Sequence, residues 1–283
     1  MSNKYKVVEL FAGVGGFRVG LEASGVWEVA FANQWEPGKK NQWAFDCYTK
    51  HFKDGIHSNI DIAKVDTKDI PDHTLLVGGF PCQSLSIAGK RGGFDDTRGT
   101  LFFDIARILS HKRPRHFLLE NVKGLLSHDS GKTFQTILRV LTDIGYYVEW
   151  QVLNSKNFGV PQNRGRVFLV GHLGGLRGRK VFPLGQANAN ALRQIIPGSQ
   201  GMRVYDNNCS TTIAGLAGGW GAKTGLYAIP ELNGYRIRRL TPVECARLQG
   251  FPDDWHEGVS DSQAYRCYGN AVTVNVIEAI ITR

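Results

Sequence analysis

Cys82 follows a proline and an apolar run in the stretch GGFPCQSLS, residues 78–86. A structural cysteine would be expected inside the apolar run TLLVGG of residues 74–79, whereas Cys82 comes just after it. In a parallel α/β sheet, reactive groups lie outside the carboxyl ends of the strands. The position therefore predicts that the thiolate of Cys82 is a nucleophile.

Three further side chains could assist such a thiolate. Glu120 lies near the end of the apolar run HFLLEN, and Arg164 and Arg166 lie in the motif PQNRGR. A carboxyl group can hold or give a proton, and cations can orient both it and a substrate. Each residue alone also fits a plainer interpretation, such as a buried cysteine, a strand-end polar group or surface charge. Their coincidence at strand ends favours a catalytic site.

A glycine-rich turn, FAGVGG at residues 11–16, lies between an expected strand and an expected helix. Glycine permits close approach of the backbone to a ligand, and a helix N-terminus offers free N–H groups. The pattern departs from G-x-G-x-x-G and by itself equally fits a turn without a ligand. Trp35, Glu36 and Asp61 follow later strands, where an indole could stack on adenine and a carboxylate could bind ribose hydroxyls. A nucleoside-bearing cofactor is therefore predicted, with its identity open.

The elements that must position these residues alternate between strand and helix patterns, which predicts an α/β fold with a mostly parallel sheet. A helix with a capping box at Thr241 and Glu244 is predicted to end at Gly250, and a last helix is predicted to return to the first domain. The domain prediction is 1–175 plus 259–283 for catalysis and cofactor binding, and 176–258 for a small, loop-rich recognition domain. Strands are expected at 6–11, 26–33, 74–79, 116–121, 146–154 and 166–171, and helices at 16–25, 37–52, 101–110, 133–145, 240–250 and 272–280.

Composition sets outer limits on the function. The 283 residues are 42% hydrophobic and carry a net charge of +9, which favours a polyanionic partner. The five cysteines form no C-x-x-C pair, so neither a zinc site nor a disulfide framework is predicted. No apolar run approaches the roughly 20 residues of a membrane span, and no signal-peptide pattern precedes the first strand, so a cytoplasmic location is expected.

The chain resembles the DNA cytosine-5 methyltransferases, especially the small bacterial restriction–modification enzymes. FAGVGG, GGFPCQS, ENV, PQNRGR, RRLTPVECARLQGF and QAYRCYGNAV occur in the order and approximate spacing of that family. The resemblance covers residues 5–173 and 200–280. It implies a Rossmann-like S-adenosylmethionine-dependent methyltransferase fold, no metal, and methyl transfer to C5 of a flipped-out cytosine through a Cys82–C6 bond.

The resemblance also implies roles for individual residues. Cys82 would attack C6, Glu120 would bind N3 and the exocyclic amine, and Arg166 with Arg164 would orient Glu120 and the base. Where the family usually has an acidic ribose contact, this chain has Gln34, so a partial replacement or recruitment of Glu36 is expected. Positions that match cofactor contacts are Phe11, Ala12, Gly13, Gly15, Gly16, Phe17, Gln34, Trp35, Glu36, Asp61, Ile62, Pro81, Asn270 and Val272.

DNA contacts follow from the same resemblance. The expected partner is double-stranded DNA, with a cognate restriction endonuclease acting on the same site as a further expectation, and the protein is expected to be a monomer. Gln200 would fill the space left by the flipped base, and Arg203 would reach guanine. The DNA-contacting residues expected are Gln83, Lys90, Arg98, Gln200, Arg203 and Thr212.

Three alternatives stay open at this stage. A cytosine-5 transfer RNA methyltransferase would share the fold, but such relatives tend to lack a recognition segment like STTIAG and AKTGLY. A catalytically silent DNA-binding paralogue would not need the set of Cys82, Glu120, Arg164 and Arg166. A nicotinamide-dependent oxidoreductase would explain the glycine turn but neither Cys82 nor Glu120.

Overall fold

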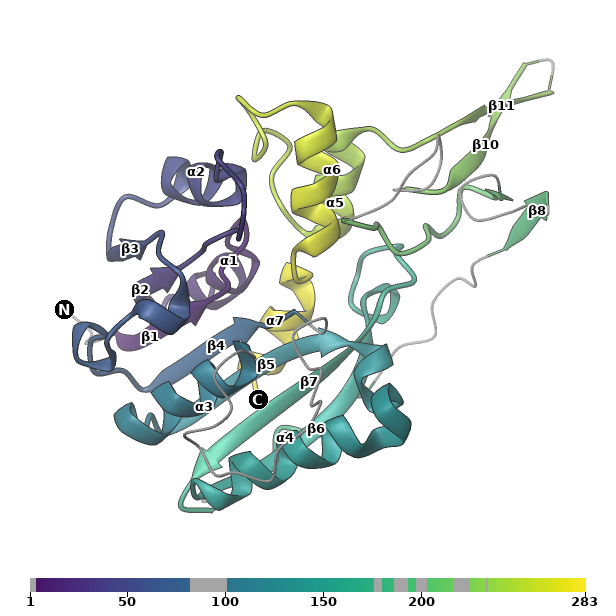
Figure 1. The fold of residues 1–283 in the computed structure, drawn as a ribbon. Helices are drawn as coiled ribbons and strands as arrows, with labels where there is room; N and C mark the ends of the chain where they lie inside the picture. The colour runs from purple at the N-terminus through teal and green to yellow at the C-terminus, as the bar shows by residue number, and fades with distance from the viewer. Residues whose placement is uncertain are drawn as a thin grey trace.

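Two sheets organise the chain (Figure 1). The computed structural model describes residues 4–81, 101–175, 180–185, 193–196, 203–215, 224–232 and 234–283. The larger sheet has seven strands in the order β3-β2-β1-β4-β5-β7-β6, and the smaller has four in the order β11-β10-β9-β8. The strands are β1 (Tyr5–Leu10), β2 (Trp27–Asn33), β3 (Ile56–Ser58), β4 (Leu75–Gly79), β5 (His116–Val122), β6 (Tyr146–Asn154), β7 (Gly165–Leu173), β8 (Gln194–Ile196), β9 (Val204–Tyr205), β10 (Leu226–Glu231) and β11 (Gly234–Arg238).

The larger sheet is parallel from β3 through β5, and β7 runs antiparallel to both of its neighbours, β5 and β6. The predicted α/β class with a mostly parallel sheet is therefore confirmed. β1 has buried side chains on both faces, as Val7 and Val8 enter different hydrophobic clusters. A strand covered on both faces is apolar along its length, which explains why these strands were visible in the sequence.

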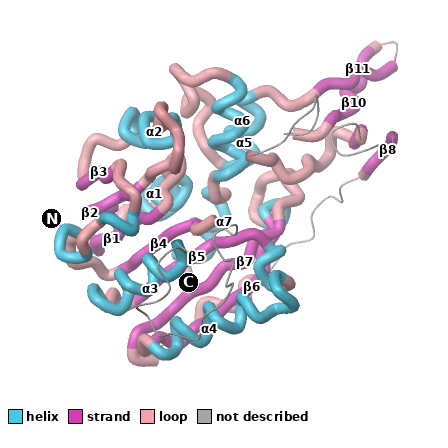
Figure 2. Tube along the Cα trace, in the orientation of Figure 1, coloured by secondary structure: helices cyan, strands magenta, loops and turns pink. Residues whose placement is uncertain are grey.

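Helices cover both faces of the larger sheet (Figure 2). α3 (Leu101–Lys112) and α4 (Lys132–Asp143) pack on one face, where Phe102 and Phe134 join the cluster that contains Val8. α1 (Gly16–Glu22) and α7 (Val274–Ile281) pack on the other, and the predicted return of the last helix to the first domain is confirmed. None of the helices in the described residues is long and apolar enough to span a membrane.

α2 (Trp43–His51) corrects one prediction, because the helix expected from Pro37 begins only at Trp43. The side chain of Gln42 donates to the carbonyls of Glu36 and Lys39 and accepts from the Glu36 N–H, which holds the preceding residues in turns. Local hydrogen bonding by a polar side chain competes with the helix in this way. The sequence patterns also missed β3, a short edge strand, α6 (Asp261–Asn270) and the four strands of the smaller sheet.

α5 (Pro242–Gln249) has the predicted form. Thr241 and Glu244 make the capping box, and Gly250 ends the helix with a φ of 81°. α5 and α6 share a third hydrophobic cluster with Val14 of the glycine turn and Ala44 of α2. Both helices therefore pack against the glycine turn and α2, and the domain boundaries at 175/176 and 258/259 stay predictions.

Candidate active site

Glu120 lies at the carboxyl end of β5, directly opposite Gly79 at the end of β4. A Cβ atom at Gly79 would lie only 3.2 Å from Glu120 Oε2, so a glycine is the residue that leaves room for this carboxylate. The turn Phe80–Pro81 follows β4 and leads to Cys82, which is outside the described residues. The predicted nucleophile therefore follows Gly79, the residue opposite Glu120, by three positions in the sequence.

Arg166 holds Glu120. Its Nε lies 3.0 Å from Glu120 Oε1, and the two side chains are 14% and 12% exposed. The pair forms because β7 runs antiparallel to β5, which sets Arg166 opposite Val122. Burial raises the pKa of Glu120 and the neighbouring Arg166 opposes that rise, so the carboxyl group is poised to hold a proton more readily than a free glutamate. The structure thus brings Glu120 and Arg166 together, and the role of Arg166 in orienting Glu120 stays a prediction.

Arg164 has a different environment from the one expected. Its buried guanidinium donates to the backbone carbonyls of Ile213, Gly269 and Ala271 at 3.2, 3.0 and 2.7 Å. These hydrogen bonds join distant segments, while the nearby charge of Arg164 opposes the rise in the pKa of Glu120, so the orienting role of Arg164 stays a prediction. Burial, with the like charge of Arg166, lowers the pKa of Arg164 to about 9, so the guanidinium stays charged at neutral pH.

Asn121 is a positioning residue that sequence reasoning treated only as a strand-end polar group. Its buried side chain donates from Nδ2 to the Phe80 carbonyl at 2.8 Å and accepts from the Val122 N–H. The bond to the Phe80 carbonyl holds the backbone directly after β4 against β5. The available signal was the motif ENV itself, because a buried amide next to a carboxylate needs a partner.

The glycine turn lies at the carboxyl end of β1. Gly13 and Gly15 have φ values of 56° and 93°, and Phe11 also has a positive φ of 55°. A Cβ atom at Gly15 would lie 2.5 Å from the Phe52 ring, and one at Gly16 would lie 2.7 Å from the Val272 carbonyl, so packing alone requires these two glycines. At Gly13 a Cβ atom would meet nothing within 4 Å, which leaves the turn facing open space. That space fits a ligand held by the backbone.

Polar side chains follow β2 and β3, which lie next to β1 on one side of the sheet. Gln34, directly after β2, accepts a hydrogen bond from the Gly13 N–H through Oε1 at 2.8 Å. Asp61 accepts from the Ala63 N–H at 3.1 Å and caps the short turn that follows β3. Glu36 forms an ion pair with Arg266 at 2.8 Å, so the alternative that Glu36 replaces the missing acidic residue is not favoured. The turn, Gln34 and Asp61 fit a nucleoside with hydroxyl groups.

The other predicted cofactor positions differ in their exposure to solvent. Ala12, Phe17, Ile62 and Val272 are buried in the hydrophobic clusters. Pro81 and Asn270 are exposed, and Trp35 is half-buried.

Comparison with known proteins decides the family. The family model of C-5 cytosine-specific DNA methylases matches residues 5–197 and 212–283. This chain belongs to that family. It is 41% identical to the Type II methyltransferase M.NgoBI of Neisseria gonorrhoeae, covering 97% of this chain and 91% of that protein. It is 36% identical to M.HhaI of Haemophilus parahaemolyticus, covering 97% and 92% respectively. The predicted enzyme class, DNA cytosine-5 methyltransferase, is confirmed.

Solved structures support the fold of this methylase. The Dnmt2 methyltransferase of S. pombe superposes with a TM-score of 0.76 at 20% identity, over 99% of this chain and 98% of that one. A mutant DNMT2 of Spodoptera frugiperda superposes with a TM-score of 0.74 at 18% identity, over 99% of each chain. The expected Rossmann-like methyltransferase fold is therefore confirmed.

The described cysteines of the methylase are poor nucleophiles. Burial raises the pKa of the Cys47 thiol to about 11 and those of Cys245 and Cys267 to about 12, and it raises the pKa of Cys209 as well. A nucleophilic cysteine needs its thiolate form. These four thiols stay protonated at neutral pH, which leaves Cys82 as the candidate.

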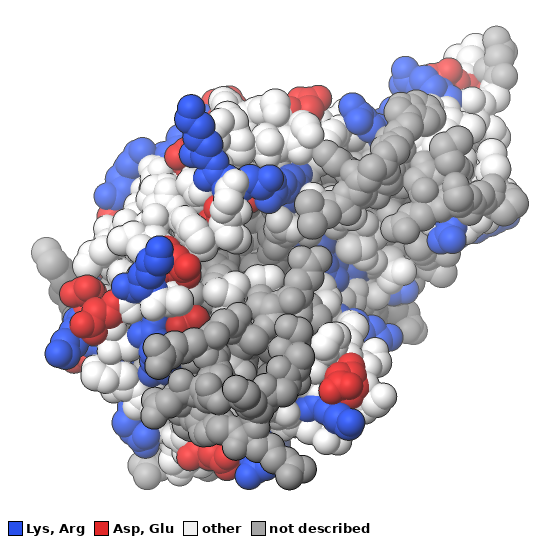
Figure 3. All heavy atoms as spheres, in the orientation of Figure 1, with Lys and Arg blue, Asp and Glu red and all other residues white. Residues whose placement is uncertain are grey.

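Two of the predicted DNA contacts can be placed. Thr212 is exposed and donates from Oγ1 to the Asn163 carbonyl at 2.7 Å, and Arg203 is exposed directly before β9. Gln83, Lys90, Arg98 and Gln200 lie outside the described residues. Lys and Arg side chains occur both over the catalytic part and on the projecting arm that carries β10 and β11 (Figure 3).

A junction between the two sheets was missed by sequence reasoning. Gln162 is fully buried; its Nε2 donates to the Leu248 carbonyl at 2.9 Å, and its Oε1 accepts from the Ile213 N–H at 3.3 Å. The Ser210 N–H donates to the Pro161 carbonyl at 2.7 Å. The motif PQNRGR thus supplies both the active-site Arg166 and the residues that tie the recognition segment to the catalytic sheet.

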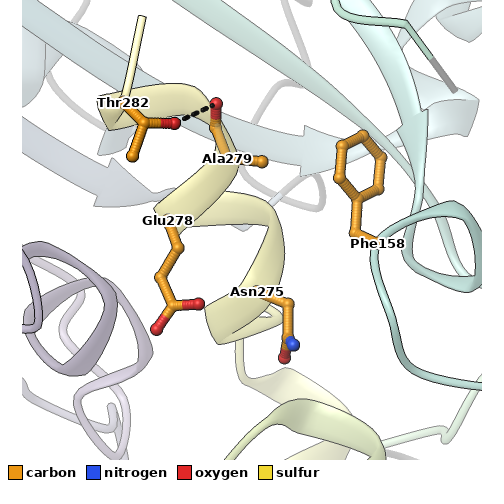
Figure 4. Close-up of a pocket in the computed structure, with 5 residues that line it drawn as sticks. All are labelled: Phe158, Asn275, Glu278, Ala279 and Thr282. Carbon is orange, nitrogen blue, oxygen red and sulfur yellow. Dashed lines mark hydrogen bonds between the residues drawn. The ribbon is translucent and has the colours of Figure 1, made fainter.

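A shallow pocket lies elsewhere, on the face of α7 (Figure 4). Figure 4 shows Phe158 facing the helix residues across the depression, and none of the lining residues belongs to the predicted site. They are Phe158, Asn275, Glu278, Ala279 and Thr282. The chemistry assigned above therefore lies at the strand ends and not in this pocket.

Proposed function

We propose that this methylase transfers a methyl group to C5 of a flipped-out cytosine in a specific double-stranded DNA sequence, through a bond between Cys82 Sγ and C6. One observation supports it most: the buried Glu120–Arg166 pair, at 3.0 Å, lies beside β4, the strand that precedes Cys82 in the sequence. The carboxyl group and the cation therefore lie at the carboxyl end of the sheet, and the sequence adds the thiol three residues after Gly79.

The reaction needs an activated base, because cytosine C5 is a weak nucleophile. Addition of the Cys82 thiolate to C6 places electron density at C5 and makes that carbon nucleophilic. Glu120 binds N3 and the exocyclic amine and holds a proton at N3 while negative charge develops. Arg166 keeps the Glu120 carboxyl in place. Once C5 carries the methyl group, loss of the C5 proton and cleavage of the Sγ–C6 bond would release 5-methylcytosine and restore the thiolate.

S-adenosylmethionine fits the open glycine turn, and when bound it supplies an electrophilic sulfonium methyl group. Backbone groups of residues 11–16, with Gln34 and Asp61, would hold its nucleoside. Phe17 and Val272 would form the apolar floor below it. Because a base inside the duplex cannot reach Cys82, the cytosine must leave the base stack, which costs roughly a few kcal/mol of unstacking and unpairing free energy.

The biological setting forms part of the same proposal. M.NgoBI and M.HhaI are named Type II methyltransferases, which supports a restriction–modification role with a cognate endonuclease acting on the same site. The sources of these relatives are bacteria, which supports a cytoplasmic location. The oligomeric state expected for this enzyme is a monomer.

Bisulfite sequencing of DNA treated with the purified protein and S-adenosylmethionine tests the proposal. Wild-type protein should protect cytosines within one short sequence, and Cys82→Ser should protect none while still binding S-adenosylmethionine. Cys267→Ser is the matched control and should methylate like wild type. Methylation by Cys82→Ser at the wild-type rate would contradict the mechanism, and methylation of transfer RNA but not DNA would favour the RNA alternative.

A second arm identifies the nucleophile directly. DNA with 5-fluorocytosine at the target should trap a covalent complex, because fluorine cannot leave as a cation after methyl transfer. Mass spectrometry should find the adduct on the peptide that contains Cys82. An adduct on one of the other four cysteines would contradict the assignment.

A further inference from the structure

Residues 181–184 are bound to β6 by side chains instead of by a backbone ladder. The Glu149 carboxylate accepts from the backbone N–H groups of Val181 and Phe182, both at 3.3 Å. The Gln151 amide accepts from the Leu184 N–H at 2.8 Å and donates to the Leu184 carbonyl at 3.1 Å. We call these two residues and the segment 181–184 the β6 clamp.

The β6 clamp is buried on the α1 and α7 face of the sheet. Glu149 is 7% exposed, and Phe182 and Leu184 are 6% and 5% exposed within the hydrophobic cluster of that face. Glu149 and Gln151 share the face because side chains alternate along a strand. The apolar side chains of the segment therefore enter the core while its polar backbone is satisfied by Glu149 and Gln151.

Two histidines complete the environment of the buried Glu149 carboxylate. His172 Nε2 lies 3.1 Å from Glu149 Oε1, and His116 Nδ1 lies 3.1 Å from His172 Nδ1. With His172 donating through Nε2, its Nδ1 accepts from His116. Glu149 thus has three donors, as a buried carboxylate requires. The mechanism proposed above does not use any of these four side chains.

The position of the β6 clamp in the chain suggests its purpose. It holds residues 181–184, which precede β8 in the chain by nine residues, since β8 begins at Gln194. β8 is the edge strand of the smaller sheet, all three of its residues are exposed, and it pairs with β9 at only two register positions. Arg203, the predicted reader of guanine, directly precedes β9. An edge strand with few pairing contacts depends on the segment that precedes it. If that segment detaches, the effective concentration of β8 near β9 falls and the two strands pair less.

We propose that Glu149 and Gln151 are positioning residues for target recognition: the β6 clamp anchors the entry to β8 and thereby holds β9 and Arg203 in place for DNA. This proposal rests on the proposed function for its DNA readout. It concerns the placement of the recognition sheet, and not the chemistry at Cys82.

Two isosteric substitutions test it. Glu149→Gln sets an amide N–H₂ against donors, and Gln151→Glu sets a carboxylate oxygen against the Leu184 carbonyl. Both break the β6 clamp, yet one raises the net charge by one and the other lowers it by one. Glu28→Gln is the control, because Glu28 is an exposed strand carboxylate on β2 paired with Lys6.

Steady-state methylation of genomic DNA from a methylation-deficient bacterium, with tritiated S-adenosylmethionine, gives the first readout. Both clamp variants should raise the KM for DNA by about tenfold, the order expected for a broken buried hydrogen bond, with kcat and the Kd for S-adenosylmethionine unchanged. The control should match wild type. A KM that moves in opposite directions in the two variants would identify a charge effect and overturn the proposal. A fall in kcat with an unchanged KM would also overturn it.

Hydrogen exchange followed by mass spectrometry gives a second readout that needs no activity. The amides of residues 181–184 and of β9 should both exchange faster in the clamp variants than in wild type. Faster exchange at 181–184 alone would sever the link to the recognition sheet and overturn the proposal. If wild-type protein methylates no DNA, the proposed function fails, while the exchange data still decide whether the β6 clamp holds β9.

Discussion

The Oε1 oxygen of Gln34 accepts a hydrogen bond from the backbone N–H of Gly13 at 2.8 Å. This bond joins the end of β2 to the glycine turn after β1 and occupies one acceptor beside the open space at Gly13. Gln34 therefore already has the position of the acidic residue that the family resemblance led us to expect, and it lacks only the charge.

Gln34→Glu should tighten S-adenosylmethionine binding, by about 1 kcal/mol for a hydrogen bond that becomes charge-assisted. The substitution keeps the acceptor for Gly13 and adds a charged oxygen toward a ribose hydroxyl. Isothermal titration calorimetry measures the change, with Gln194→Glu on exposed β8 as the control. Weaker binding would mean that a carboxylate here repels Glu36 or Asp61 more than it helps.

Arg166→Met should raise the pKa of Glu120 further, because it removes the cation that favours the carboxylate while burial still favours the neutral acid. It should also lower kcat by about a hundredfold or more, as expected for a lost electrostatic contact in an active site. Infrared difference spectra across a pH titration report the protonated carboxyl group, with Glu120→Gln as the reference that lacks it.

Arg139→Met, on the exposed face of α4, serves as the control for the Arg166 experiment, because its partner is the exposed Asp143. It should leave both the Glu120 titration and kcat at wild-type values. If the titration midpoint of Glu120 in Arg166→Met equals or falls below the wild-type midpoint, Arg166 does not set the protonation of this carboxyl group.

Glu9 should make stability fall as the pH rises. Burial raises its pKa to about 8, against an ordinary value of 4.5, although the Tyr48 hydroxyl donates to it at 2.8 Å. The unfolded state loses this proton near pH 4.5 while the folded state keeps it, so the free energy of unfolding declines between these two values. The total decline is of the order of a few kcal/mol.

Glu9→Gln keeps the neutral form and should flatten the decline in the free energy of unfolding between about pH 5 and about pH 8, measured by urea titration at each pH. Glu28→Gln, which removes an exposed carboxylate on β2, is the control and should retain the wild-type slope. An unchanged slope in Glu9→Gln would show that Glu9 ionises in the folded state with an ordinary pKa.

Arg203→Ala should weaken binding to the cognate duplex by about 1–3 kcal/mol and change binding to scrambled DNA much less. A guanidinium that reads guanine O6 and N7 loses a sequence-specific contact, whereas one that binds phosphate weakens all sequences alike and reduces the salt dependence. Titration of both duplexes at two salt concentrations separates these cases. Equal losses on the two duplexes would assign Arg203 to general affinity.

The local patterns of the sequence determined most elements of the larger sheet. β4 and β5 were visible because they are buried on both faces and therefore apolar along their length, and α5 was visible because its capping box, proline and terminal glycine are local signals. Cys82, Glu120 and Arg166 were marked as chemical residues by their types and their positions near strand ends. Such features depend on a few neighbouring residues.

The tertiary structure decided which side chains meet. β7 inserts antiparallel between β5 and β6, which brings Arg166 to Glu120 and directs Arg164 to the carbonyls of Ile213, Gly269 and Ala271. Likewise Gln42 delays the start of α2, and Glu149 binds Val181 from another segment. Strand order and side-chain hydrogen bonds join segments far apart in the chain, so their energies depend on contacts that no local pattern contains. The sequence therefore determined which residues carry the chemistry, and long-range packing decided their partners.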